Sequence, residues 1–174
     1  MSIYALGDKL LTDKDLQVDR TNYFRNSSLE IQTGKLKSDG TIWIFDYADW
    51  SNKDHVNETW TASVFIDNSQ GKAPLYIQSW SSKLGMIFGN PINTGTQGIS
   101  SFTFNTGNST AETLSNINFV IATDASKYKD LDFDVKYKQQ MLEHGTLVTS
   151  WTPNPQDIQS KIQDLQNQIN QLKK

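Results

Sequence analysis

The stretch that decides the fold runs Thr59-Trp60-Thr61-Ala62-Ser63-Val64-Phe65-Ile66. Apolar side chains recur at every second position from Trp60 onward, and the other positions carry Thr61, Ser63 and Phe65. Because side chains alternate between the two faces of a β-strand, this period of two predicts a strand that buries one face. The stretch therefore favours a β-sheet whose core side begins at Trp60.

Other segments also have a strand-like pattern, and turn residues such as Gly, Pro, Asn and Asp separate them. Many short strands with turns between them are typical of an all-β fold, an antiparallel β-sandwich of the jelly-roll type. In the last segment, a period of two places Phe133, Val135, Tyr137 and Met141 on one face. The predicted segments are 23–31, 41–47, 59–66, 74–80, 84–88, 99–105, 117–122 and 133–142.

The end of the chain follows a different period. Its apolar residues are separated by steps of four, three, four and three, which is the heptad spacing of an α-helical coiled coil. Such a stripe can be buried against another copy of the chain or against the chain's own domain, and we expect a short oligomerisation stem. Ile at heptad position a with Leu at d favours two parallel strands. The stripe consists of Ile158, Ile162, Leu165, Ile169 and Leu172.

The start of this helix is well marked. Asn154 is an expected N-cap, Pro155 takes the first helical position, and Asp157 places a carboxylate in the first turn. The chain then divides into a leader or arm over 1–21, a β-sandwich over 22–153 and a helical stem over 154–174. The leader fits equally well a partly ordered segment and an arm that docks on a neighbouring subunit.

Composition excludes several classes of protein. The 174 residues carry a net charge of −3, which argues against a general binder of nucleic acid, because such a protein needs a basic face. There is no cysteine, so disulfides and thiolate metal sites are absent. No apolar run is long enough to span a membrane, and the N-terminus lacks the apolar core of a signal peptide. We expect a protein made in the cytoplasm, with no nucleic-acid or membrane partner.

Aromatic residues are the best candidates for binding. A flat aromatic ring can cover the apolar face of a sugar, while nearby carboxylates and amides bond its hydroxyl groups. Alternation puts Trp43 with Tyr47 on one strand face, and Tyr76 with Trp80 on another. In the alternative interpretation, these rings form the core and the aliphatic side chains lie outside. The candidate saccharide site is Trp43, Tyr47, Trp50, Tyr76 and Trp80, with Asp46 and Gln78 as polar partners.

Three stretches together resemble a module that recurs in tailed-phage structural proteins. Arg25-Asn26-Ser27-Ser28 is similar to the module's L-R-N-S opening, and residues 59–66 resemble its Y-T-L-S-F-Y-I strand. Residues 141–145 and 150–157, which read M-L-E-H-G and S-W-T-P-N-P-Q-D, resemble its closing signature. That signature is a K-L-E-x-G turn followed by W-T/S-P-A-P-E-D, and the resemblance spans residues 22–157.

The resemblance implies a carbohydrate-binding-like jelly roll in tail, baseplate or receptor-binding assemblies of phages that infect Gram-positive bacteria. It further implies a place in the virion, host cell-wall polysaccharide and other virion proteins as partners, and a helix or fibre after the closing signature. In that setting the stem is expected to join three copies, whereas the a and d residues favour two.

The expected function is that of a non-enzymatic adhesin of a phage tail, baseplate or fibre, which binds a saccharide of the host cell surface. The alternative is a structural spacer, decoration or assembly module of the virion. A glycan-cleaving enzyme would need a pair of carboxylates such as Asp46 and Asp49, but their spacing alone supports no such pair. We find no phosphate-binding loop and no Gly-x-Ser-x-Gly motif, so no catalytic residue is predicted.

One group of carboxylates in the sequence could bind a metal ion. Asp130, Asp132 and Asp134 alternate along a strand start, and several carboxylate oxygens suit a structural calcium ion. A solvated acidic edge strand explains the same pattern and is our preferred interpretation. His55 and His144 lack the spacing of a zinc site. We therefore expect no cofactor and assign no metal ligand.

Overall fold

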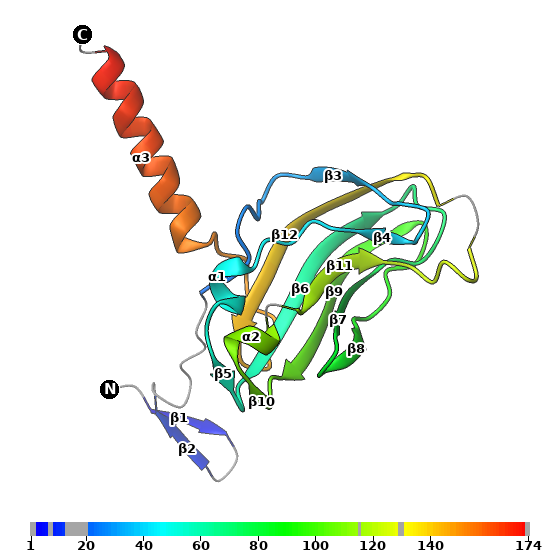
Figure 1. Ribbon diagram of the computed structural model, residues 1–174, viewed down its shortest axis with the longest axis horizontal. Coiled ribbons are helices and arrows are strands. Elements are labelled where there is room, and N and C mark those ends of the chain that lie inside the picture. The colour runs from blue at the N-terminus through cyan, green and yellow to red at the C-terminus, as the bar shows by residue number, and fades with distance from the viewer. Residues whose placement is uncertain (1–2, 7–8, 13–20, 115, 129–130, 173–174) are drawn as a thin grey trace.

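The structure, a computed structural model, describes residues 3–6, 9–12, 21–114, 116–128 and 131–172 (Figure 1). Two four-stranded antiparallel sheets are stacked as a β-sandwich, and a helix leaves the sandwich near the end of the chain. The expectation of an antiparallel β-sandwich followed by a helix is therefore confirmed.

The first sheet, named here the β6 sheet, has the strand order β3-β12-β6-β9. Its strands are β3 (Gln32–Lys35), β6 (Thr59–Asn68), β9 (Thr96–Asn105) and β12 (Asp134–His144). The second, named the β7 sheet, has the order β4-β11-β7-β8. Its strands are β4 (Thr41–Ile42), β7 (Tyr76–Ser81), β8 (Gly85–Phe88) and β11 (Asn118–Ala122).

The chain crosses repeatedly between the sheets. β3 lies in the β6 sheet and β4 in the β7 sheet, and the same change of sheet occurs between β6 and β7, β8 and β9, and β11 and β12. This course of eight strands through two sheets is the jelly-roll arrangement.

Smaller elements lie together at one end of the sandwich (Figure 1). They are the one-turn helices α1 (Ala48–Ser51) and α2 (Ala111–Leu114), and the paired short strands β5 (His55–Val56) and β10 (Asn108–Ser109). Near the N-terminus, β1 (Ile3–Leu6) and β2 (Lys9–Thr12) form a hairpin that lies apart from the sandwich in Figure 1. The rest of the predicted leader up to residue 20 lies outside the described residues.

The core fills the space between the two sheets. Trp60, Ala62, Val64 and Ile66 are all buried, as the alternation in β6 predicts. Aromatic rings dominate the end of the core near α1, where Phe119 stacks on Phe102 with ring centroids 6.3 Å apart. Buried aromatic rings contribute large apolar areas, so they offset the low aliphatic content of the chain.

The predicted face of β12 is only partly correct. The register with β6 shifts between Lys138 and Met141, and Gln139 adopts a positive φ of 57° at this bulge. An extra residue in a strand moves every following side chain to the opposite face. Leu142 therefore joins the core cluster, whereas the expectation had placed Met141 on the same face as Tyr137.

The predicted strand 41–47 ends early, at Ile42. Beyond it, the chain makes an isolated bridge in which the Arg25 amide donates to the carbonyl of Asp46 at 2.8 Å. The carbonyl of Tyr47 then accepts from the amide of Trp50, which begins the turn of α1. Strict alternation therefore fails after residue 44.

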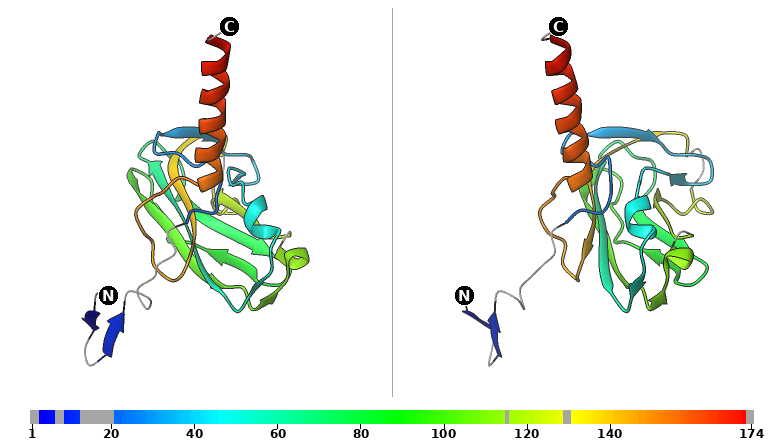
Figure 2. Two further views of the ribbon diagram at one scale, coloured as in Figure 1. Left: turned by 90° about the vertical axis from the view of Figure 1, so that its left-hand side faces the viewer. Right: turned by 60° about the vertical axis from the view of Figure 1, so that its left-hand side comes forward.

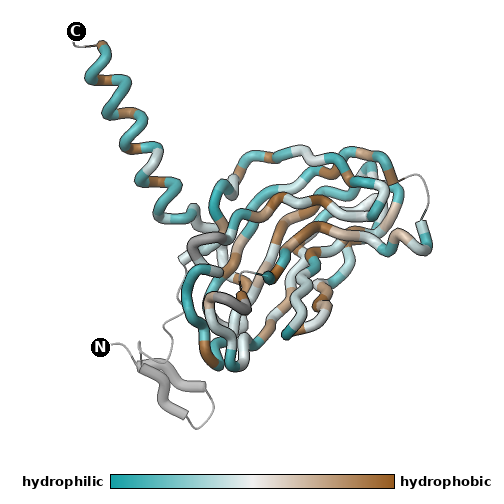
Figure 3. The backbone as a smooth tube through the Cα atoms, in the orientation of Figure 1, coloured by the Kyte–Doolittle hydropathy of each residue, from teal (hydrophilic) through white to brown (hydrophobic). Residues whose placement is uncertain are grey.

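α3 (Pro155–Leu172) projects from the sandwich (Figures 1 and 2). Asn154 is its N-cap, because its Oδ1 accepts the amide of Gln156 at 2.8 Å. Asp157 in the first turn accepts the main-chain amide of Asn26 at 2.6 Å. No residue of α3 is buried, and hydrophobic positions recur between hydrophilic ones along the helix in Figure 3.

Candidate functional site

The outer face of the β7 sheet carries the predicted aromatic residues of β7. Tyr76 and Gln78 are half-buried and Trp80 is 45% exposed, while Ile77 and Ser79 between them are buried. The alternation of the strand therefore directs Tyr76, Gln78 and Trp80 to the same outer side.

β8 extends this face with two residues that the sequence analysis did not select. Phe88 pairs with Gln78 and Met86 pairs with Trp80, and both are slightly more than half exposed. The Phe88 ring meets Tyr76 edge-on, with centroids 5.5 Å apart and planes at 80°. Cross-strand neighbours of this kind form a continuous surface.

Trp43 belongs on the same outer side. Ile42 pairs with Ile121 in β11, and Ile42 and Ile44 both pack toward the core, so the residue between them points outward. The Trp43 side chain is 56% exposed. We name this surface the aromatic face; it consists of Trp43, Tyr76, Gln78, Trp80, Met86 and Phe88.

The middle of the aromatic face is lined by small or short side chains of β11. Val120 pairs with Gln78 and Ala122 pairs with Tyr76, and both are almost fully buried. Asn118 pairs with Trp80, and the Tyr47 hydroxyl lies 3.5 Å from Asn118 Oδ1. Val120 and Ala122 therefore offer almost no surface to a ligand.

Trp50 is not on this face, which corrects the sequence prediction. Its side chain is fully buried, and its ring stacks on His55 at 5.0 Å and meets Trp60 edge-on at 5.5 Å. The single turn of α1 directs the ring inward, where it fills the end of the core. No part of the ring is accessible to a ligand.

Tyr47 and Asp46 also lie elsewhere. Tyr47 packs against Phe119 with centroids 5.1 Å apart, and its hydroxyl donates to the main-chain carbonyl of Ile117. Burial raises the pKa of the Tyr47 hydroxyl. Asp46 bridges to Arg25 at the base of α3, away from β7. Of the predicted saccharide residues, the structure therefore brings together Trp43, Tyr76, Gln78 and Trp80.

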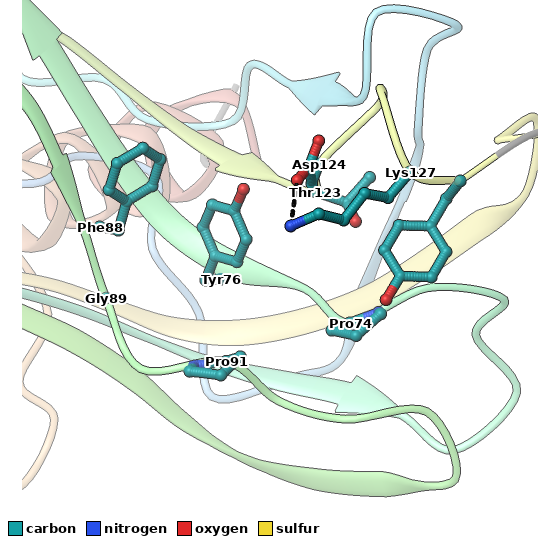
Figure 4. Close-up of a pocket in the computed structure, with 9 residues that line it drawn as sticks. Pro74, Tyr76, Phe88, Gly89, Pro91, Thr123, Asp124 and Lys127 are labelled. Carbon is teal, nitrogen blue, oxygen red and sulfur yellow. Dashed lines mark ion pairs between the residues drawn. The ribbon is translucent and has the colours of Figure 1, made fainter.

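A pocket opens where the aromatic face meets the loop after β11 (Figure 4). Its cavity measures about 370 Å³, and Tyr76 and Phe88 belong to both the pocket and the aromatic face. In Figure 4 the Tyr76 ring stands between Phe88 and Lys127. The remaining lining comes from Pro74, Gly89, Pro91, Thr123, Asp124, Lys127 and Tyr128.

One wall of the pocket is a preformed ion pair. Lys127 Nζ lies 2.9 Å from Asp124 Oδ2, while Asp124 Oδ1 accepts from the hydroxyl and the amide of Ser126. These hydrogen bonds, led by that of Ser126, lower the pKa of Asp124 to about 2. Burial, and then the charge of Asp124, raise the pKa of Tyr76, so its hydroxyl stays protonated at neutral pH. The pair presents no net charge to a ligand.

Thr123, which lines the pocket, carries a buried polar atom without a partner in the described part of the chain. Thr123 is 7% exposed, and its Oγ1 has no hydrogen-bond partner among the described residues. A buried hydroxyl without a partner is costly. Sequence patterns missed Thr123 and Asp124 because they lie in a turn, where no period marks a side chain as part of a site.

The described residues contain no group of three His, Asp or Glu side chains that could hold a metal ion. Asp132 instead pairs with Lys35 at 2.9 Å, and Asp130 lies outside the described ranges. No helix in the described part of the chain has the length and apolar character needed to cross a membrane.

No family model matches the chain, and no curated protein matches it. Among solved structures, the chain is similar to the N-terminal endo-1,4-β-D-xylanase 10B of Clostridium thermocellum, in a structure of its CBM22-1 and GH10 modules complexed with xylohexaose. The TM-score is 0.37 and the identity 12%, over 78% of this chain and 29% of that chain. A likeness this distant carries no argument about what the present chain binds.

Proposed function

We propose that this chain is a non-catalytic saccharide-binding module that uses the aromatic face and its adjoining pocket. The observation that carries the proposal is the gathering of Trp43, Tyr76, Trp80 and Phe88 on one accessible sheet face, with Gln78 between them. Exposed aromatic rings in a contiguous patch mark an interaction surface, and amide and hydroxyl groups among them suit a ligand rich in hydroxyls.

Charge supports a neutral ligand. The Asp124 carboxylate and the Lys127 ammonium are already paired with each other at the pocket. A free anion or cation would have to compete with that contact, whereas hydroxyl groups can both donate to the carboxylate and accept from the ammonium.

We further propose that the module works in a phage virion, as a tail, baseplate or fibre component. The support is the resemblance of residues 22–157 to a phage module. The proposed partners are host cell-wall polysaccharide and other virion proteins. Weak binding by each copy would be strengthened where several copies act together, because the second contact forms at high effective concentration.

A purely structural module of the virion is the second candidate. The observation in its favour is the exposed apolar stripe of α3, which fits an assembly element and is unrelated to the aromatic face. In this case the aromatic face would contact another virion protein and bind no sugar.

Titration calorimetry against cell-wall polysaccharide fragments of Gram-positive bacteria tests the proposal. We expect the wild type to bind. Trp80→Ala and Trp43→Ala should each weaken binding by about tenfold or more, because Trp side chains that a ligand covers contribute much of the binding free energy. Leu147→Ala is the matched control, because Leu147 is similarly exposed but lies in the loop after β12. It should bind like the wild type.

The other possible outcomes distinguish a saccharide-binding module from a structural module and from an enzyme. Absence of binding by the wild type would remove the saccharide proposal and leave the structural one. Binding that both Trp variants retain would show that the aromatic face is not the site. Release of reducing ends from the polysaccharide would indicate an enzyme instead.

A further inference from the structure

The apolar stripe of α3 is uncovered. Ile158, Ile162, Leu165 and Ile169 are each 44 to 57% exposed, and Leu172 is 87% exposed. A lone helix of this length is marginal in water, and most helices gain their stability by packing an apolar face. Figures 1 and 2 show α3 projecting away from both sheets. The stripe therefore needs a partner that is not the sandwich.

The side of α3 that faces the sandwich is a different, polar side. A cleft of about 390 Å³ separates the loop at Arg25–Ser28 from the helix. On the helix it is lined by Asp157, Ser160, Lys161 and Asp164. At about 100° per residue, these side chains share one side of α3, and the apolar stripe is centred roughly 110° around the helix from them. This geometry excludes burial of the stripe against the chain's own domain.

The base of α3 is fixed to the sandwich. Asp157 accepts the Asn26 amide at 2.6 Å, and its Oδ1 lies 3.4 Å from Arg25 Nε. Asn154, which caps the helix, also donates from Nδ2 to the carbonyl of Asn22 at 2.9 Å. These contacts join the first turn of the helix to the start of the sandwich, so the stripe is held in one orientation relative to the domain.

We propose that α3 pairs in parallel with α3 of a second copy of this chain, through the stripe. A partner must present the same repeat of four and three residues, and a second copy does. The heptad has Ile162 and Ile169 at a and Leu165 and Leu172 at d, which is the pattern that favours parallel two-stranded pairing.

The positions that flank the stripe permit contact between identical helices. Gln159 and Gln166 occupy heptad position e, and Lys161 and Gln168 occupy position g. In a parallel pair, Lys161 of one helix lies opposite Gln166 of the other, so no like charges meet. Identical copies therefore approach each other without repulsion.

Parallel pairing places both sandwiches at the same end of the stem. Pairing of α3 does not depend on whether the aromatic face binds sugar, so this pairing goes beyond the proposed function. Should the aromatic face bind saccharide, one stem would present two such faces to the same surface.

Light scattering and sedimentation equilibrium of the full chain test the proposal. Because the stripe covers only about two heptads, we expect a mass of two chains that dissociates in the micromolar to millimolar range. The double variant Ile162→Asp with Ile169→Asp should be a monomer throughout that range, because each helix would have to bury two carboxylates in the pair. Gln163→Asp with Asn170→Asp adds the same charge one residue further along, off the stripe, and should still pair.

Disulfide cross-linking tests the parallel orientation separately. An added cysteine reports on one position alone, because the chain has no cysteine of its own. In a parallel pair, an Ile169→Cys variant should form an interchain disulfide under mild oxidation, since the two residues meet in one layer of the stem. A monomeric wild type at millimolar concentration overturns the proposal, as does a dimer that survives the Ile162 and Ile169 changes. A mass of three chains overturns the two-stranded count, and failure of Ile169→Cys to cross-link a dimer overturns the parallel orientation.

Discussion

Asn154 contacts Asn22 across the junction between helix and sandwich, with Asn154 Nδ2 donating to the Asn22 carbonyl at 2.9 Å. The Asn22 side chain in turn donates to the carbonyls of Gln140 and Thr152 and accepts the amide of Leu142. Two buried amides therefore join the first residues of the sandwich, the end of β12 and the cap of α3.

This junction predicts the effect of changing the helix cap. Asn154→Ala removes the acceptor for the Gln156 amide and the donor to Asn22, and we expect a loss of about 1–3 kcal/mol in the free energy of unfolding. Asn154→Ser keeps the capping oxygen and loses only the contact with Asn22, so its loss should be smaller. Urea unfolding followed by circular dichroism measures both variants. Equal losses in the Ala and Ser variants would show that the capping oxygen contributes nothing to the free energy of unfolding.

A second prediction concerns the carboxylate of Glu58. Glu58 Oε2 accepts from Trp60 Nε1 at 3.1 Å and lies 2.7 Å from His55 Nδ1, and His55 and Trp60 are both buried. Glu58→Ala leaves two buried ring nitrogens without this acceptor. We expect a loss of about 1–3 kcal/mol in unfolding free energy, measured by urea titration.

The control for Glu58 is Glu30→Ala, because Glu30 is exposed. Its effect should stay within about 0.5 kcal/mol, as is usual for surface substitutions. Similar losses in the two variants would contradict a structural role for the Glu58 carboxylate.

The hydrogen bonds of Asp124 predict its titration. The pKa of this carboxyl should lie near 2 in the folded protein, against an ordinary value of 3.8, and ¹³C NMR of the carboxyl carbon measures it. Ser126→Ala and Lys127→Ala should each raise the pKa of Asp124, because the side-chain hydrogen bonds from Ser126 and Lys127 are the two largest causes of the shift.

The sign of the linked stability follows from the lowered pKa of Asp124. Its contribution is present above about pH 4 and is lost as the pH falls toward 2, because protonation then removes the acceptor. Since Asp124 lies at the surface, where solvent screens its contacts, saccharide binding is the more sensitive readout, and binding should not change between pH 5 and 8 on account of this group. A titration midpoint near 4 would contradict the observed hydrogen bonds.

Local alternation was sufficient to predict much of the sandwich. Trp60 and Val64 point to the core because β6 is long and regular, with ten residues in register with β9. The face of Met141 could not be predicted, since a bulge depends on the register between two distant strands. Trp50 gave no local signal either, because its burial depends on the turn of α1 and on the rings of His55 and Trp60.

The candidate site was likewise predicted from the sequence only in part. Tyr76, Gln78 and Trp80 lie on one side because a single strand carries them. Phe88 was missed, because β8 reads Gly85-Met86-Ile87-Phe88, a short apolar run whose outward positions are set only by pairing with β7. The pocket lies beyond sequence patterns, since it combines β7, β8 and the turn after β11.

A last prediction tests the close packing at the floor of the pocket. A Cβ atom added at Gly89 would lie 2.7 Å from both Ile77 Cγ2 and Ser100 Oγ, and 3.0 Å from the carbonyl oxygen of Ser101. Ser100 Oγ is itself occupied, because it accepts the Ile77 amide and donates to the Asn90 carbonyl, so it cannot move without breaking both bonds.

Gly89→Ala should therefore destabilise the protein by about 1–3 kcal/mol, as overpacking does in a tightly filled site, and should also weaken saccharide binding because Phe88 and Pro91 adjoin it. Thermal unfolding and calorimetry measure the two effects. Gly98→Ala is the control, because its added Cβ would meet only Ile92 at 3.4 Å, an ordinary contact. Equal stability of the two variants would show that β8 and β9 can separate, and that the pocket floor is not fixed by this contact.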